Sequence, residues 1–160
     1  SWLVGSRLGG SGAGWALVGS KPAGMDLDAT RKFLREHHRS ILATSRSDGR
    51  PQLSPVVHGL DDEGRVIISS RETAYKVRNL RRDPAASLCA FPDSFFGQWI
   101  QVDGQADIVS LPEAMELLVA YYRQLSGEHP DWDDYRAAMI RDRRLVIRIN
   151  LERAGPDRSG

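Results

Sequence analysis

The sequence predicts an α+β or mainly β fold, in which six antiparallel strands curl into a small barrel with helices at its periphery. Short apolar runs alternate with turn-forming groups such as Ser47-Asp48-Gly49-Arg50 and Asp61-Asp62-Glu63-Gly64, which is typical of strands joined by hairpins. Helical periodicity occurs in only a few separate stretches, one of them between the third and fourth expected strands. Six strands with an inserted helix are enough to close a small barrel.

The N-terminal half is expected to form one helix followed by a three-stranded meander. Asp28 is the expected N-cap of the helix, and Leu27, Phe33 and Leu34 recur at helical spacing. Pro55 has no N–H to donate, so its strand is not expected to be fully paired in the sheet interior. The expected strands are residues 40–45, 52–60 and 65–70.

The C-terminal half is expected to mix helices and strands. A helix is expected from Thr73, as its N-cap, to Asp83, because the residue before Pro84 rarely stays helical. Gly104 indicates a bend or bulge in a long strand. The remaining expected elements are strands 86–91 and 98–109, helices at 112–126 and from residue 131, and a half-buried edge strand at 145–151.

One domain is expected over residues 25–151. Residues 1–24 are dominated by Gly and Ser and are interpreted as an N-terminal extension or a segment foreign to the native chain, with Met25 as the native start. Residues 152–160 are interpreted as a C-terminal tail.

The composition argues against several classes of function. The 160 residues carry a formal net charge of +1, so no bulk field attracts nucleic acid or a membrane surface. No apolar run approaches the roughly 20 residues that cross a bilayer, and no hydrophobic block of signal-peptide type precedes the domain. The lone Cys89 cannot form an internal disulfide. We therefore expect a cytoplasmic protein that binds neither nucleic acid nor membranes.

The segment from Ser70 to Lys76 is the best candidate for a binding site. A lysine in the first turn of a helix opposes the helix dipole, at a cost of about a few tenths of a kcal/mol. A bound anion reverses that penalty, since free N–H groups, a hydroxyl and a lysine together bind phosphate. We expect Ser70, Thr73 and Lys76 to hold a cofactor phosphate; the alternative is a basic helix face exposed to solvent.

Other polar residues favour structural roles. The sequence has no nucleophile elbow, no favourable Ser-His-Asp spacing and no paired Cys or His ligands, so no metal site is expected. His37 and His38 suit a helix C-terminus, and His58 is expected to be packed or at the surface rather than to face a substrate. The acidic group beginning at Asp131 is interpreted as a helix cap rather than a cation site.

Four strings resemble a known superfamily. They are SILATSRSDGRPQLSPV, VIISS, RETAYKVRNLRRDP and GEHPDWDDYRAAM, and the resemblance covers about residues 26–151. They are similar to the pyridoxamine 5'-phosphate oxidase-like split β-barrel superfamily, and within it to the flavin/deazaflavin oxidoreductases of subgroup B. These form the actinobacterial branch that uses the deazaflavin coenzyme F420. The resemblance implies a six-stranded FMN-binding split barrel that forms a homodimer.

The resemblance also implies a coenzyme site and places residues in it. They are Arg50, Pro51, Gln52 and Ser54 along the coenzyme, Ile68 and Ser69 at its ring edge, Lys76 at its phosphate, and Trp99, Ile100, Gln101 and Arg144 from the other subunit. Positions 73 and 74 depart from the relatives, which carry Pro and Arg there, so the phosphate contact rests on Lys76 more than on Thr73.

These residues suggest an F420-dependent reductase that transfers hydride to a small conjugated or quinone-like substrate. The coenzyme carries the chemistry, so no catalytic residue is expected. Basic residues near the phosphate suit the anionic glutamate tail of F420, which FMN lacks; they are Arg71, Arg78, Arg81 and Arg82. The alternatives are an FMN enzyme like the pyridoxamine-phosphate oxidases and a non-catalytic carrier of F420 or flavin. The fold does not fix the substrate.

Overall fold

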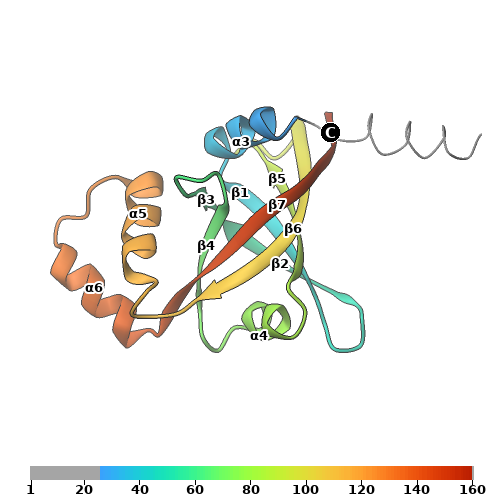
Figure 1. The fold of residues 1–160 in the computed structure, drawn as a ribbon. Coiled ribbons are helices and arrows are strands. Elements are labelled where there is room, and N and C mark those ends of the chain that lie inside the picture. Colours follow the sequence, from blue (N-terminus) through green and yellow to red (C-terminus); the bar gives the residue numbers. More distant parts are fainter. Residues whose placement is uncertain (1–25, 160) are drawn as a thin grey trace, which may run out of the picture.

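The computed structural model describes residues 26–159, so the expected N-terminal extension lies outside the described residues. Figure 1 shows helices around a strongly curled sheet. In chain order the elements are α3 (Leu27–Glu36), β1 (Arg39–Ser45), β2 (Pro51–Val57), β3 (Gly59–Leu60), β4 (Val66–Arg71), α4 (Tyr75–Arg82), β5 (Ala85–Phe91), β6 (Gln98–Val109), α5 (Met115–Ser126), α6 (Trp132–Arg141) and β7 (Arg144–Ser159).

The strands form one antiparallel sheet in the order β2-β1-β5-β6-β7-β4-β3. The sheet curls until β2 and β4 come into contact, which gives a half-barrel of the α+β class. Seven strands replace the expected six, because the expected strand at 52–60 is divided. The chain leaves β1 at His58, so that β2 pairs with β1 while β3 pairs with β4.

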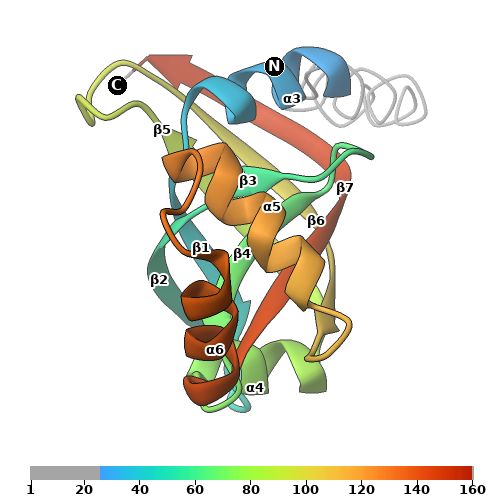
Figure 2. The same cartoon turned by 90° about the vertical axis from the view of Figure 1, so that its left-hand side faces the viewer.

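Alternating side chains of the strands fill the barrel. On β1, Ser40, Leu42 and Thr44 are buried while the residues between them face outward, as period-two strands require. Helix α3 covers one end of the barrel and α4 the other (Figure 1). Figure 2 shows α5 lying across β3 and β4. Within residues 26–159, no helix has both the length and the apolar character that a membrane span requires.

The sequence-based prediction of the bulge in β6 is confirmed. The register of β6 against β7 shifts between Asp103 and Gly104. A Cβ at Gly104 would collide with the carbonyl oxygen of Asn150, which explains why a glycine occupies this position. The predicted cap of α6 is also confirmed, because the Asp131 side chain accepts a hydrogen bond from the Asp134 N–H at 3.1 Å.

Several predicted boundaries were wrong. Asp26, not Asp28, is the N-cap of α3, and its side chain accepts from the Asp28 N–H at 3.0 Å. The last strand is not at an edge, because β7 lies between β6 and β4. It also continues to Ser159, through the residues expected to form a tail, because the long β6 supplies pairing partners for them.

Candidate functional site

The sheet leaves a gap in its hydrogen bonding where β2 faces β4. Strand β2 is the edge of the sheet, which agrees with the expectation from Pro55. Strand β4 pairs with β3 only at Val66 and Ile67. The main chain of β4 from Ile68 onward therefore has no strand neighbour on this side, although β2 lies against it.

Helix α5 closes one end of this gap. The Tyr121 hydroxyl donates to the carbonyl oxygen of Val57 at 2.7 Å. One turn later, the Gln124 side chain accepts from the Leu60 N–H at 2.7 Å and donates to the Leu60 carbonyl at 2.8 Å. These side chains take up edge groups of β2 and β3 that would otherwise be unpaired.

Helix α4 closes the other end. Asn79 is buried, and its amide donates to the Gln52 side chain at 2.8 Å and to the Thr44 hydroxyl at 3.1 Å. Residues 51–56 of β2 and 68–71 of β4 remain between the two helices, and we call these facing edges the seam. The seam offers main-chain N–H and C=O groups that no neighbouring strand uses.

A pocket of ≈ 210 Å³ lies at the α4 end of the seam. We call it the Lys76 pocket, and its lining residues are Ser69, Ser70, Arg71, Thr73, Ala74, Lys76 and Arg144. Among the residues that the structure describes, no carboxylate lines it. Burial lowers the pKa of Lys76, and the nearby positive charge of Arg144 lowers it further. The pocket therefore concentrates positive charge that the protein itself does not neutralise.

Arg144 gives a second indication that the pocket suits an anionic ligand. Its Nε is buried and, within the described part of the chain, has no hydrogen-bond acceptor. A buried donor without an acceptor is costly, so an acceptor brought by a ligand would bind favourably here. Arg144 lies beside Lys76 of the same chain, whereas the resemblance implied that it reaches the site from the other subunit.

The start of α4 leaves donors available to the same pocket. The prediction that Thr73 is the N-cap was wrong. The N-cap is Ala74, whose side chain makes no capping hydrogen bond. Thr73 instead lines the pocket with an exposed side chain. The Val77 N–H donates to the Ala74 carbonyl at 3.1 Å. The Tyr75 and Lys76 N–H groups, which come before it, have no partner inside the helix and are able to bind an anion.

A larger basic pocket of ≈ 430 Å³ lies on the other side of Tyr75. We call it the Arg78 pocket, and its lining residues are Arg46, Ser47, Gln52, Tyr75, Arg78, Asn79 and Arg82. The Arg78 guanidinium lies 5.6 Å from the centre of the exposed Tyr75 ring. Arg81, which the sequence suggested as part of this basic group, instead pairs with Glu72 at 2.7 Å and lowers the pKa of that carboxyl.

The residues assigned to the coenzyme by resemblance fall into three groups. The two strands of the seam carry Pro51, Gln52, Ser54 and Ser69, whereas Arg50 lies in the hairpin turn before β2. Arg50 and Pro51 are exposed. Ile68 and Ile100 are fully buried in the core, so only their main chains are able to touch a ligand. Trp99 and Gln101 lie on β6, apart from the residues that line the Lys76 pocket.

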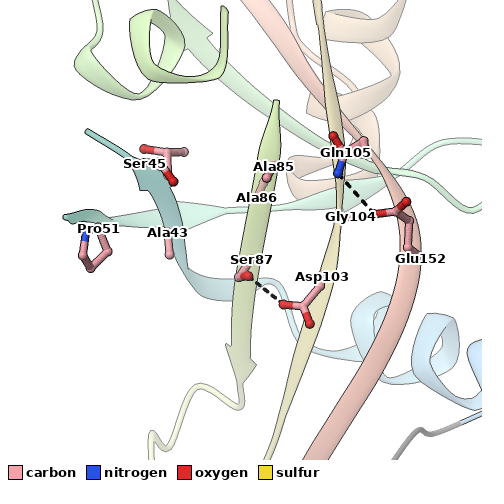
Figure 3. A pocket seen from close by; sticks show the side chains of 11 residues that line it. Ala43, Ser45, Pro51, Ala85, Ala86, Ser87, Asp103, Gly104, Gln105 and Glu152 are labelled. Atoms are coloured by element: carbon pink, nitrogen blue, oxygen red, sulfur yellow. Dashed lines mark hydrogen bonds between the residues drawn. The ribbon is translucent and has the colours of Figure 1, made fainter. Parts of the chain in front are cut away.

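The outer face of the sheet carries further hollows that no helix lines. Figure 3 shows one of ≈ 310 Å³, in which Ser87 donates to Asp103 at 2.6 Å and Gln105 points toward Glu152. A neighbouring hollow of ≈ 270 Å³ is lined by Ile41, Ala43, Leu53, Ser87, Leu88, Cys89 and Gln101. Gln101 therefore faces away from the barrel interior of its own chain.

His58 has a structural role, as expected from the sequence. It is fully buried, and its Nε2 donates to the Leu34 carbonyl at 3.0 Å, so its Nδ1 accepts from the Ser40 hydroxyl. Burial lowers the pKa of His58 to about 4, which keeps the ring neutral at physiological pH. Among the described residues, no group of three His, Cys, Asp or Glu side chains is placed to hold a metal.

Sequence reasoning missed the polar residues that close the seam. Tyr121 lies in the stretch 112–126, for which the sequence predicted only a helix, and nothing local distinguishes it from Tyr122. Asn79 gave a signal, because an asparagine among arginines in the segment YKVRNLRR disfavours a simple solvent-exposed face. Arg46 lies in a turn, where its direction depends on the fold.

A family model described as pyridoxamine 5'-phosphate oxidase matches residues 27–155. The chain belongs to this family. The match includes both strands of the seam, helix α4 and most of β7. The pyridoxamine 5'-phosphate oxidase-like split barrel expected from the sequence is therefore confirmed at the level of the family.

Solved structures agree with this family fold. A conserved hypothetical protein from Mycobacterium tuberculosis is 25% identical, with a TM-score of 0.68 over 82% of this chain and 84% of that one. A protein named F420 reductase is 21% identical, with a TM-score of 0.62 over 78% and 94% of the two chains. The heme storage protein HutZ from Vibrio cholerae is 19% identical, with a TM-score of 0.61 over 84% and 95%. Proteins named for different functions thus share the fold of this family member.

Proposed function

We propose that this protein is an F420-dependent oxidoreductase that binds its coenzyme along the seam, with the coenzyme phosphate in the Lys76 pocket. The observation that carries the proposal is the pair Lys76 and Arg144. These two cations line one pocket without a carboxylate, and the buried Nε of Arg144 lacks an acceptor. A phosphate supplies both the charge and the acceptors that the pocket lacks.

The seam suits a flat heterocycle beside the phosphate. Flavin and deazaflavin rings carry an edge of alternating carbonyl and N–H groups. The unpaired main chains of β2 and β4 offer the same kinds of groups in the same alternation. Ser69 belongs to both the seam and the Lys76 pocket, so a ring in the seam continues directly into a phosphate in the pocket.

The Arg78 pocket favours F420 over FMN. A single phosphate occupies one cationic site, whereas F420 carries a phosphate and, farther along, the carboxylates of its glutamate tail. Tyr75 lines the Arg78 pocket, while its neighbours Ala74 and Lys76 line the Lys76 pocket. Two adjacent basic pockets therefore match a ligand with two separate anionic parts.

When bound, the reduced deazaflavin supplies hydride. The residues of the chain bind and orient: Lys76 and Arg144 hold the phosphate, the seam orients the ring, and Asn79 fixes α4 against β1 and β2. The substrate would be a small conjugated or quinone-like molecule that lies against the exposed face of the ring.

We also propose that the protein acts as a homodimer. Leu53 and Val57 on the outer face of β2 are 63% and 47% exposed, and the partly exposed Phe91 and Cys89 lie on the same sheet face. A contiguous apolar sheet face is characteristic of an interface. A second copy on this face would bring its Trp99 and Gln101 toward the seam of the first, as the resemblance implies.

Titration of the purified protein with F420 and, separately, with FMN tests the coenzyme, using quenching of tryptophan fluorescence. We expect micromolar or tighter binding of F420, at least about tenfold weaker binding by Lys76→Ala and Arg144→Ala, and no change for the exposed Lys32→Ala. Arg78→Ala should weaken the binding of F420 but not the binding of FMN. A yellow purified protein that prefers FMN would support the FMN-dependent alternative instead.

Turnover separates an enzyme from a carrier. Reduced F420 should be oxidised by the protein when a panel of quinones and conjugated enones is added. Tight binding without substrate-dependent oxidation would favour the carrier. Failure of both coenzymes to bind a folded sample would refute the proposed function.

A further inference from the structure

One carboxylate belongs to the segment that builds the Lys76 pocket and yet does not line that pocket. Residues 69–76 contain a single acidic residue, Glu72. Its neighbours Arg71 and Thr73 both line the pocket, whereas Glu72 does not. The carboxylate therefore lies outside the pocket, although the positive charge there would attract it.

Two side chains from elsewhere in the fold hold this carboxylate. The Arg81 guanidinium donates to one oxygen of Glu72 at 2.7 Å, and the Ser110 hydroxyl donates to the other at 2.9 Å. Arg81 also donates to the Ser110 hydroxyl at 3.3 Å, so the three side chains form a closed set of contacts, which we call the Glu72 clasp. Arg81 lies in the last turn of α4 and Ser110 directly follows β6, so the clasp joins both elements to the end of β4.

The main chain of Glu72 has a separate role in the same pocket. Its N–H donates to the carbonyl oxygen of Arg143 at 3.1 Å. Arg143 precedes Arg144, which pairs with Arg71 in the register of β4 and β7. This contact helps to place Arg144 and does not depend on the carboxylate. Replacing Glu72 by glutamine therefore removes the charge and leaves the main-chain contact in place.

The Glu72 carboxylate is ionised at neutral pH. The hydrogen bond from Arg81 lowers its pKa; burial acts in the opposite direction, and the hydrogen bond from Ser110 lowers the pKa further. Without the clasp, an ionised carboxylate would be attracted to the cations of the neighbouring Lys76 pocket. It would then compete with a phosphate for them, because both are anions that accept the same hydrogen bonds.

We propose that Arg81 is a positioning residue for the coenzyme phosphate, because it holds the Glu72 carboxylate out of the adjacent pocket. The proposal rests on the proposed function. It gives Arg81 a role different from the one that the sequence suggested, since Arg81 would act on a carboxylate of the protein and not on the anionic tail of the coenzyme. The two cations of the pocket thereby stay available to the phosphate.

A double-mutant cycle of Arg81→Gln and Glu72→Gln tests the proposal. Quenching of tryptophan fluorescence measures the affinity for F420 and for the same deazaflavin without its phosphate and tail. Arg81→Gln should weaken the binding of F420 about fivefold and leave the binding of the phosphate-free compound unchanged. Glu72→Gln alone should change the affinity for F420 by less than about twofold, because the clasp already holds the carboxylate away. Combined with Arg81→Gln, it should restore the wild-type affinity.

A second ion pair of the same length provides the control. Arg136 and Glu116 lie 2.7 Å apart, as Arg81 and Glu72 do, and neither lines the Lys76 pocket. Arg136→Gln should therefore leave both affinities at their wild-type values. Arg81→Lys, which keeps the positive charge, should bind F420 more tightly than Arg81→Gln does.

The outcomes separate the two proposals. Suppose that wild-type protein binds F420 and that Arg81→Gln binds it equally well, or weakens the phosphate-free compound as much. The positioning role is then overturned while the proposed function stands. The same follows if the double variant stays as weak as Arg81→Gln, because Arg81 would then contact the coenzyme itself. Additive effects of the two substitutions would also overturn it, because the charges would then act only at a distance.

The identity of the coenzyme is tested separately. If wild-type protein binds FMN and not F420, the same cycle with FMN and riboflavin decides the role of Arg81, and only the choice of coenzyme fails. If it binds neither, both proposals fail together. Weaker binding of the phosphate-bearing coenzyme by Arg81→Gln, with restored affinity in the double variant and little effect of Glu72→Gln alone, supports the inference.

Discussion

Two residues, Lys76 and Arg144, bring positive charge together in a pocket that no carboxylate of residues 26–159 lines. The pKa of Lys76 is lowered by burial and by Arg144, so this lysine loses its proton at a lower pH than an ordinary lysine. The charged form is the one that binds an anion. The affinity of the wild-type protein for F420 should therefore fall as pH rises from about 8 to 10.

Lys76→Arg checks this pH dependence, because arginine stays charged throughout that range. We expect the affinity of this variant for F420 to be flatter between pH 8 and 10 than that of wild type, as measured by fluorescence titration. Lys32→Arg, on the exposed face of α3, should leave the wild-type profile unchanged. A profile for Lys76→Arg as steep as that of wild type would assign the titration to another group.

His58 controls stability at acid pH. Its pKa is lowered by burial to about 4, whereas in the unfolded chain it lies near 6.5. Between these values the unfolded chain binds a proton that the folded protein does not, so stability is full above about pH 6.5 and is lost as pH falls toward 4. The shift corresponds to about 3 kcal/mol at most.

His58→Gln should remove most of this acid dependence, because glutamine can hydrogen-bond and does not titrate. Urea unfolding of both proteins at pH 7, 5.5 and 4.5 measures it. We expect the free energies of unfolding to differ most at pH 7, where wild type benefits from its intact hydrogen bonds, and to converge at acid pH. Parallel profiles would show that His58 is not the titrating group.

Site residues whose local sequence context is unusual could be predicted from the sequence. Site residues whose role depends on contacts between distant segments could not. Lys76 stood out because a first-turn lysine is unfavourable without an anion. Arg144 was found only through resemblance, since its position beside Lys76 depends on the pairing of β4 with β7. Tyr121 gave no signal, because its function depends on strands that are distant in sequence.

Among the elements, β6 shows how one backbone position constrains two strands. A Cβ at Gly104 would collide with the Asn150 carbonyl and would lie 2.9 Å from a side-chain carbon of Ile149. Neither neighbour moves freely, because both belong to β7 in the middle of the sheet. Gly104→Ala should therefore lower the free energy of unfolding by about 2 to 4 kcal/mol.

Urea unfolding compares Gly104→Ala with Gln105→Ala, which changes the exposed next residue of the same strand. Gln105→Ala should change stability by less than about 0.5 kcal/mol. An equally small effect of Gly104→Ala would mean that the bulge relaxes without cost.

The type of each element could be predicted from the periodicity of its apolar residues. Where a strand ends depends on which neighbouring strand it pairs with. The sequence indicated each described helix and nearly every strand, because apolar spacing is a local property. The division between β2 and β3 at His58 was missed, since alternation alone does not say which neighbour a strand pairs with. The extension of β7 was missed for the same reason: residues 152–159 are a polar stretch that is ordered by pairing with β6.

At the scale of the whole molecule, the proposed homodimer would form through the exposed apolar sheet face. Leu53→Asp places a charge in the centre of the proposed interface, where burial would be costly, so we expect a monomer. Light scattering after size-exclusion chromatography measures the mass. Binding of F420 should weaken as well if the partner's residues complete the groove.

Ile140→Asp is the matched control, because Ile140 on α6 is 62% exposed and Leu53 is 63% exposed. Since α6 lies on the opposite side of the molecule from β2 (Figure 1), this variant should keep the wild-type mass and coenzyme affinity. A wild-type protein that is already monomeric would refute the dimer proposal directly.

The main-chain character of the seam has a consequence for how the family diverges. Amide and carbonyl groups are common to nearly all residue types, so exchanging side chains along β2 and β4 leaves the pattern of donors and acceptors intact; only an added proline deletes a donor. Selection on such a surface acts on backbone shape more than on residue identity. Homologous barrels can then keep one mode of ligand recognition while their sequences drift apart. Proline substitutions along β2 and β4 would remove main-chain donors and so test this mode of binding, whereas alanine substitutions would leave those donors in place.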